Sequence, residues 1–224
     1  MHRHISAAYA LLTLITYFSA AHLGASSEAK AASPEVKVSE FAPVKPTEEE
    51  LKYFVGKIGK DLDDKDEFGD DQRKRIELDS ATVAVLALTL GMHDEITDYK
   101  EAAGSIVESA IEVGENVGEY DDALAAYEKL KVALEDKPKA EKLSWDASVA
   151  DIGALMRQVP IVNDKVRRGV SDKRRFARNA KKTAQKVVTL AAMAHVSMMN
   201  TDYCGDEDYE KAWKQICADM RDAC

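Results

Sequence analysis

The sequence predicts an all-α protein made of two tandem antiparallel helical bundles, the second lacking its fourth helix. Apolar residues recur every three or four positions in seven segments, the period of a helix with one buried face. Five prolines in 224 residues and an aromatic content of 7% argue against an all-β fold. A helix–turn–helix pattern also repeats at an offset of 104 residues, which indicates a duplicated module, with chance likeness of two Ala-rich helices as the alternative. The matches are Val83, Leu86 and Ala87 with Val187, Leu190 and Ala191, and Thr97-Asp98-Tyr99 with Thr201-Asp202-Tyr203.

The first 25 residues have the build of a secretory signal peptide. Arg3 precedes an apolar run from Ile5 to Ala21, and small residues follow it. We expect cleavage after Ala25 and export to the periplasm or cell envelope. An uncleaved anchor helix is the alternative, because residues 5–25 come close to the ~20 that span a bilayer. Residues 26–46, rich in Ala, Ser, Pro and Val without a helical period, are expected to form a flexible tether.

A four-helix bundle is expected over residues 47–136. Its first helix is predicted to begin at Thr47, whose hydroxyl would cap the backbone N–H of Glu50. Short polar turns between four helices of similar length favour antiparallel packing. The expected buried positions are Leu51, Phe54, Val55, Ile58 and Leu62 in the first helix, Ile76, Val83, Leu86 and Leu90 over residues 71–92, Ile106, Ala110, Val113 and Val117 after Thr97, and Ala123, Tyr127, Leu130 and Leu134 after Tyr120.

A second, incomplete bundle is expected over residues 148–224, after a polar linker at 137–147. Pro160 should kink its first helix or end a helical segment there, because proline has no N–H to donate. The last apolar stripe runs to Cys224, and by symmetry with the first half a fourth helix should cover it. The expected buried positions are Val149, Ile152, Met156 and Val159 in the first helix, Phe176, Ala180, Val187, Leu190 and Ala194 over residues 172–199, and Trp213, Ile216 and Met220 after Glu207.

Three segments carry a resemblance to a known family: residues 86–94 (LALTLGMHD), 154–163 (ALMRQVPIVN) and 216–223 (ICADMRDA). With the core pattern from about Thr47 onward, they resemble bacterial exported four-helix bundles of the cytochrome c-prime and cytochrome b types. The resemblance implies haem binding and electron transfer outside the cytoplasm. Such proteins attach haem through Cys-x-x-Cys-His near the end of the last helix, and this sequence lacks the motif. We therefore expect a degenerate member without a covalent haem site, unless the helix that carries the motif follows Cys224.

His195, Met198, Met199 and Cys204 are the candidate metal ligands. Their spacing places an imidazole and two thioethers on one helix surface, and soft sulfur beside imidazole suits Cu(I). His93 and His195, the two histidines outside the leader, are also candidates for noncovalent haem binding together with a methionine. The alternative is that the methionines fill core gaps and His195 faces water. No cofactor is expected on the leading interpretation.

A run of acidic residues from Asp61 to Asp71 lies between the first two predicted helices. Counted as a calcium loop from Asp64, Gly69 takes the sixth place, but Arg75 takes the twelfth, where a bidentate Glu is required. We therefore expect a solvated turn.

Positive charge is concentrated at the junction of the fifth and sixth predicted helices. In a chain of net charge −9, this basic cluster can dock an anionic surface or an acidic protein partner. A solvated face that offsets the acidic remainder is the alternative. Phe176 is its single aromatic residue, which together with export argues against a nucleic-acid partner. The cluster comprises Lys165, Arg167, Arg168, Lys173, Arg174, Arg175, Arg178, Lys181, Lys182 and Lys186.

The three cysteines are Cys204, Cys217 and Cys224. Cys217 and Cys224 are seven residues apart, so within one helix their Cα atoms lie about 10 Å apart, beyond disulfide reach. A disulfide-linked dimer through Cys224 is one expectation, and burial as small apolar residues is the other.

No catalytic residue is predicted, because no Gly-rich phosphate loop, paired-His zinc spacing or Ser-His-Asp order stands out in the sequence. We expect an exported structural or interaction module and not an enzyme. A haem-binding electron-transfer cytochrome is the alternative, and a periplasmic copper-binding protein is a weaker one.

Overall fold

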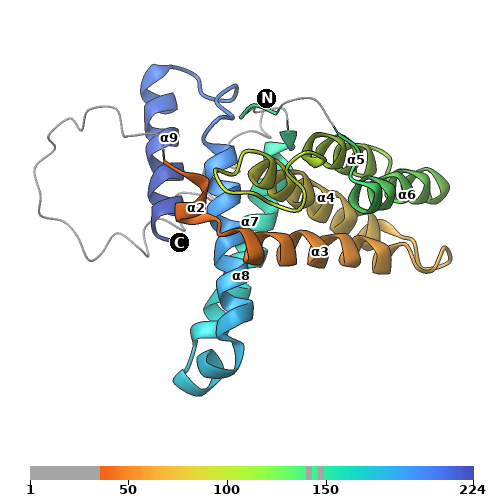
Figure 1. Cartoon of the computed structure of the whole chain (residues 1–224), viewed down its shortest axis with the longest axis horizontal. Coiled ribbons are helices and arrows are strands. Elements are labelled where there is room, and N and C mark those ends of the chain that lie inside the picture. Colours follow the sequence, from red (N-terminus) through yellow and green to blue (C-terminus); the bar gives the residue numbers. More distant parts are fainter. Residues whose placement is uncertain (1–35, 140–142, 146–148) are drawn as a thin grey trace, which may run out of the picture. The chain divides into compact units, whose positions relative to one another are not determined.

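The computed structural model describes residues 36–139, 143–145 and 149–224, and every regular element in these ranges is a helix (Figure 1). The prediction of an all-α fold is confirmed. The predicted signal peptide lies outside the described residues, and Lys37–Cys224 forms one compact unit. None of the helices in the described ranges has an apolar stretch long enough to cross a bilayer. The helices are α2 (Val38–Phe41), α3 (Val44–Asp61), α4 (Asp70–Gly91), α5 (Ala103–Glu115), α6 (Tyr120–Asp136), α7 (Ile152–Val170), α8 (Lys173–Ser197) and α9 (Glu207–Asp222).

Helix α2 corrects the expectation of a flexible tether over the described part of that segment. Val38 and Ala42 are buried, in a small cluster with Val188 of α8. Ser39 donates hydrogen bonds from its backbone N–H and its hydroxyl to the carboxylate of Asp94, at 2.8 and 2.6 Å. These bonds hold the pKa of Asp94 down at about 2. The residues just before α3 are therefore docked onto the rest of the unit.

Helix α3 begins at Val44, three residues earlier than predicted. Pro46 lies in its first turn, where backbone N–H groups have no partner inside the helix and proline is tolerated. Thr47 is consequently inside the helix, and its hydroxyl donates to the carbonyl of Pro43 at 2.7 Å instead of capping the helix. The predicted stripe of Leu51, Phe54, Val55, Ile58 and Leu62 is buried as expected.

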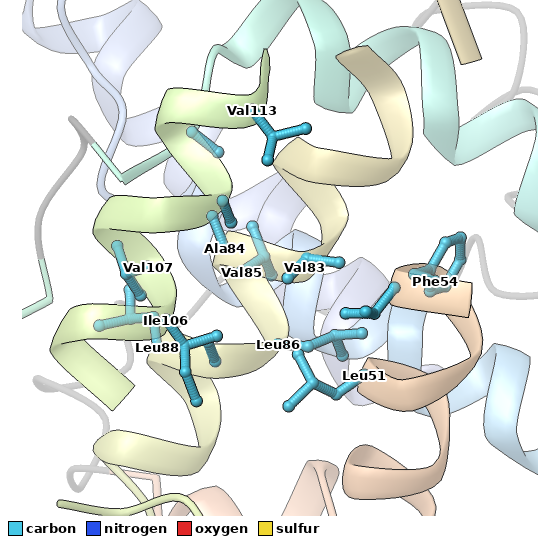
Figure 2. Close-up of a cluster of buried hydrophobic side chains, with 14 of the residues drawn as sticks. Leu51, Phe54, Val83, Ala84, Val85, Leu86, Leu88, Ile106, Val107 and Val113 are labelled. Atoms are coloured by element: carbon cyan, nitrogen blue, oxygen red, sulfur yellow. The ribbon is translucent and has the colours of Figure 1, made fainter. Parts of the chain in front are cut away.

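Helix α4 is the central helix of the unit. It packs against α3, α5, α7 and α8, and almost every residue from Leu78 to Leu90 is buried. Figure 2 shows its side chains between those of α3, such as Leu51, and those of α5, such as Ile106. The predicted stripe is buried, but it covers only part of this surface. A helix that is apolar on all sides needs neighbours on all sides.

Helix α5 begins at Ala103 and not at Thr97, because the intervening turn is itself held in the core. The Thr97 hydroxyl donates to the carbonyl of Leu90 at 3.2 Å, and Tyr99 is buried. Helix α6 begins at Tyr120 as predicted, and the Tyr120 hydroxyl donates to the carbonyl of Leu62 at 2.9 Å. Ile106, Ala110, Val113, Ala123 and Leu130 are buried as predicted, whereas Val117, Tyr127 and Leu134 are half-buried.

The two copies of the sequence repeat share an order of elements but not an environment. Helices α8 and α9 with their turn follow the same plan as α4 and α5. Tyr99 is 5% exposed, however, while its counterpart Tyr203 is 74% exposed. Val83 is fully buried, and its counterpart Val187 is only half-buried. The two copies of the repeat therefore have the same order of helix, turn and helix, but their matching residues are not packed equivalently.

One hydrophobic core extends through both halves of the chain. Leu155 and Val162 of α7 and Met193 of α8 belong to the same buried cluster as Leu86 of α4. Helix α7 packs against α4, and α8 packs against both α3 and α4. The core therefore crosses the expected boundary at 137–147, because the second side of α4 is covered by α7 and α8.

Helix α7 continues through Pro160. Of the two expectations at this residue, a kink or the end of a helical segment, the second is therefore wrong. Pro160 is exposed, while Val159 and Val162 remain buried. Packing of the apolar face on both sides of the proline thus outweighs the loss of one backbone hydrogen bond. The expectation that Phe176 points inward in α8 is also wrong, since Phe176 is 47% exposed.

A buried ion pair joins α3 to α8. The carboxylate of Glu50, 2% exposed, accepts hydrogen bonds from Lys186 Nζ at 2.9 and 2.6 Å and from the Thr189 hydroxyl at 3.0 Å. Burial lowers the pKa of Lys186, against the raising effect of Glu50. The pair joins residues that are 136 positions apart in the chain.

A second buried ion pair joins α3, α4 and α7. The Asp79 carboxylate on α4 accepts from Lys57 Nζ at 2.7 Å and from Gln158 Nε2 of α7 at 2.9 Å. Burial raises the pKa of Asp79, and Lys57 and Gln158 act against this rise. The two carboxylates thus hold α7 and α8 to the α3–α4 pair by directional contacts.

Replacement of Glu50 by Ala should lower the free energy of unfolding in urea by roughly 3–5 kcal/mol, because it leaves a buried Lys186 ammonium without a partner. The double variant Glu50→Leu/Lys186→Met should lose much less, since both charges are removed together. Glu112→Ala is the control, because it removes a solvent-exposed pair with Lys129 and should cost less than about 1 kcal/mol. Equal losses in the single and double variants would contradict the assignment.

Candidate functional site

His195 lies near the end of α8 in an aromatic enclosure that the sequence did not indicate. Its ring centroid is 4.7 Å from that of Phe41 and 4.4 Å from that of Trp145. The buried Arg221 of α9 donates from Nη1 to His195 Nδ1 at 3.2 Å. Burial lowers the pKa of His195 to about 4, and the Arg221 charge acts in the same direction. The imidazole is therefore neutral at pH 7 and accepts a hydrogen bond from a cation.

His93 links the end of α4 to Ala42, which lies between α2 and α3. The backbone N–H of Glu95 donates to His93 Nδ1 at 2.9 Å, so the ring proton lies on Nε2. Nε2 donates to the carbonyl of Ala42 at 3.0 Å. Both ring nitrogens of this fully buried side chain are thus used within the chain.

The remaining candidate ligands lie at the end of α8 and in the following turn. Met198, Met199 and Cys204 are each half-buried. In the part of the chain that the structure describes, no group of three His, Cys, Asp or Glu side chains is placed to hold a metal ion. Nδ1 of His195 and both ring nitrogens of His93 already have partners within the chain. Haem and Cu(I) binding by these residues stay predictions.

The three cysteines lie in different environments and are not joined by disulfides. Cys217 is buried, and burial raises its pKa to about 12. Cys224 is an exposed residue, yet burial of its thiol raises its pKa to about 11. Both thiols are therefore protonated at pH 7 and are weak nucleophiles there. The disulfide-linked dimer through Cys224 stays a prediction.

The acidic run forms a turn with its own internal partners. Arg75 donates from Nε and Nη2 to Asp61, with a shortest distance of 2.6 Å. Asp64 accepts from the backbone N–H of Asp66 at 2.8 Å. These contacts order the segment. They do not bring three of its carboxylates, all within the described residues, together as a cation site.

A pocket of about 420 Å³ lies between α4, α5, the start of α7 and the turn before α9. Its acidic side chains include Glu77 and Asp151. Glu77 pairs with Arg157 at 2.5 Å, and Asp151 caps α7 by accepting from the backbone N–H of Ala154 at 2.6 Å. Glu77 thus joins α4 to α7, and Asp151 caps the first turn of α7.

The basic cluster predicted from the sequence forms one continuous feature, a helical hairpin of α7 and α8 (Figure 1). We call residues 164–186 the basic hairpin. It contains ten basic and two acidic residues, a net charge of +8, so the rest of the chain carries −17. The positive charge is thus separated from the negative charge within one unit. A surface of this kind steers and orients anionic partners.

Most cations of the basic hairpin have no acidic partner among the described residues. Four are paired: Arg168 with Asp164, Arg175 with Asp172, Lys181 with Glu49, and Lys186 with Glu50. No ion pair within the described ranges involves the other six, and five of those six are exposed. These six are Lys165, Arg167, Lys173, Arg174, Arg178 and Lys182.

The two helices of the basic hairpin approach each other closely at Gly169. A Cβ atom at this position would lie 2.3 Å from the Thr183 hydroxyl, so glycine is required for the contact. A pocket of about 290 Å³ opens between the helices beside this contact. Its lining can donate hydrogen bonds to an anion from five cations, an amide and a hydroxyl. The lining residues are Lys165, Arg168, Gly169, Arg175, Asn179, Lys182, Thr183 and Lys186.

The comparisons with known proteins find no match. No family model, no curated protein and no solved structure matches the chain. The resemblance to c-prime-type bundles therefore stays a prediction. The basic hairpin is the best-defined candidate site.

His195 should make the protein less stable as the pH falls from about 7 to about 4. In this interval the unfolded chain takes up a proton on His195 that the native state excludes, so native stability is lost by roughly 3 kcal/mol at most. In His195→Gln, whose side-chain oxygen can still accept from Arg221, this contribution should disappear. The measurement is the difference in unfolding free energy between the two proteins as a function of pH. Parallel curves over this pH range would contradict the assignment.

Proposed function

We propose that the protein is an exported, non-catalytic interaction module that docks onto an anionic partner through the basic hairpin. The observation that carries this proposal is the charge separation, +8 in the basic hairpin against −17 elsewhere. Six cations of the basic hairpin have no ion pair among the described residues, so they can pair with the anionic groups of a partner. A segregated surface of this kind accelerates encounters with an anionic partner and fixes their orientation.

The buried ion pairs support this role, because they fix the basic hairpin to a stable base. Glu50 holds the middle of α8 through Lys186, and Asp79 holds α7 through Gln158. The first turns of α8 are exposed beyond these contacts, since every residue from Ser171 to Arg178 is exposed. The cations are thereby presented on helical backbone and not on a loop, which limits the entropy lost when a partner binds.

The non-catalytic part of the proposal rests on the use of the buried ionisable residues. Glu50, Asp79 and His195 each have a partner within the chain that serves packing, namely Lys186, Lys57 and Arg221. The resemblance to exported cytochromes, together with the predicted signal peptide, supports a role outside the cytoplasm. Haem-dependent electron transfer and copper binding remain alternatives from the sequence.

The proposal predicts that the protein binds a polyanion despite its net negative charge. The test is retention on immobilised heparin at low ionic strength, where the full chain should be retained and then released by added salt. Arg174→Glu, Arg178→Glu and Lys182→Glu together reverse one stripe of α8 at positions i, i+4 and i+8. This triple variant should pass through the column.

The matched control is the triple variant Lys60→Glu, Lys74→Glu and Lys139→Glu. These three exposed cations lie outside the basic hairpin, and their reversal changes the net charge by the same amount. The control should be retained like the parent protein. If both triple variants lose retention equally, net charge and not the basic hairpin determines binding, and the proposal fails.

A further inference from the structure

The end of the basic hairpin carries two exposed apolar side chains. Val170, the last residue of α7, is 50% exposed, and Phe176, in the first turns of α8, is 47% exposed. The turn at Ser171 and Asp172 separates them. Exposed large apolar residues are commonplace singly, but here a pair of them is surrounded by the densest positive charge of the molecule.

The charge at this end opposes the stability of the helix that carries it. Lys173, Arg174 and Arg175 are the first three residues of α8, where the helix dipole is positive and favours acidic side chains. Asp172 caps the helix by accepting from the backbone N–H of Arg175 at 2.7 Å, and it is the single acidic residue in this part of the basic hairpin. Three consecutive cations at a helix N-terminus are unfavourable for the helix. Locally unfavourable sequences of this kind are common at functional positions.

Cations and exposed apolar side chains together fit one class of anionic partner better than others. A soluble polyanion or an acidic peptide would pair with the cations and leave Val170 and Phe176 in water. The interface of an anionic bilayer offers phosphate groups to the cations and acyl chains to the apolar residues. Both kinds of side chain then have a partner.

We propose that residues 170–176, the hairpin tip, insert into the interface of an anionic phospholipid bilayer, at the boundary between headgroups and acyl chains. This inference rests on the proposed function and specifies its partner. The negative charge on the rest of the chain is repelled by the same surface, so the basic hairpin approaches first. The close contact between Gly169 and Thr183 keeps the two helices together directly behind the tip. Lys and Arg side chains on both helices then bind phosphate groups on either side of the inserted residues.

The experiment is cosedimentation of the full chain with vesicles of phosphatidylglycerol and phosphatidylcholine, compared with vesicles of phosphatidylcholine alone. The parent protein should bind the anionic vesicles only, and added salt should weaken the binding. Phe176→Ala should weaken it by about tenfold, because the ring would no longer be buried in the interface. Tyr209→Ala is the matched control, since Tyr209 is 68% exposed on α9 and should have no effect.

A spectroscopic measurement reports insertion directly. The fluorescence of Phe176→Trp should shift to the blue on binding and be quenched by vesicles with brominated acyl chains. Tyr209→Trp is the control and should show neither change. Both variants contain the two native tryptophans, so the background fluorescence is the same. Circular dichroism and unfolding of each variant will show that the fold is retained.

The outcomes separate this inference from the proposed function. Retention on heparin without binding to anionic vesicles would overturn the bilayer as partner and leave the proposed function standing. Vesicle binding that is lost in the Arg174→Glu, Arg178→Glu and Lys182→Glu variant but unchanged in Phe176→Ala, without quenching of Phe176→Trp, would overturn insertion. Absence of binding to both heparin and vesicles would overturn both proposals.

Discussion

The buried carboxylate of Glu50 is the contact on which the arrangement of the two halves depends. It lies on α3, while its partners Lys186 and Thr189 lie on α8, so the contact sets the position of α8 along α3. Apolar packing alone is tolerant of small slips between helices, whereas a buried charge is stable only in contact with its counter-charge. Asp79 and Gln158 fix α7 against α4 in the same way. These two contacts therefore fix the position of the basic hairpin.

Helical periodicity in the sequence was sufficient for the class of fold and for most buried positions. Leu51, Phe54 and Ile58 recur at helical spacing, and all three are fully buried. Glu50 illustrates what periodicity does not contain. The sequence pattern assigned a role to its backbone N–H, as the group that Thr47 would cap, yet the partner of its side chain is 136 residues away. Local rules describe a residue's neighbours in the chain, and they carry no information on the partners that tertiary packing brings to it.

The candidate site was predictable in charge but not in shape. The ten cations were visible as a cluster, because charge density can be counted along the chain. The exposure of Phe176 was not predicted, because helical spacing assigns a face to a residue but does not show where the neighbouring helix ends. The enclosure of His195 was missed for a related reason. Phe41, Trp145 and Arg221 come from three distant segments, and one of them was expected to be a flexible tether.

The all-round burial of α4 has a consequence for how the protein acquires its structure. A chain synthesised only as far as α6 already contains α3, α4 and α5, but the side of α4 that packs against α7 and α8 is still open to water. The protein therefore cannot complete its core in the order of synthesis. The contacts that complete the core join residues far apart in the chain, 79 positions for Asp79 and Gln158 and 136 for Glu50 and Lys186. Such long-range contacts slow folding and prolong the exposure of apolar surface. Late burial of apolar surface thus follows from the position of a single helix.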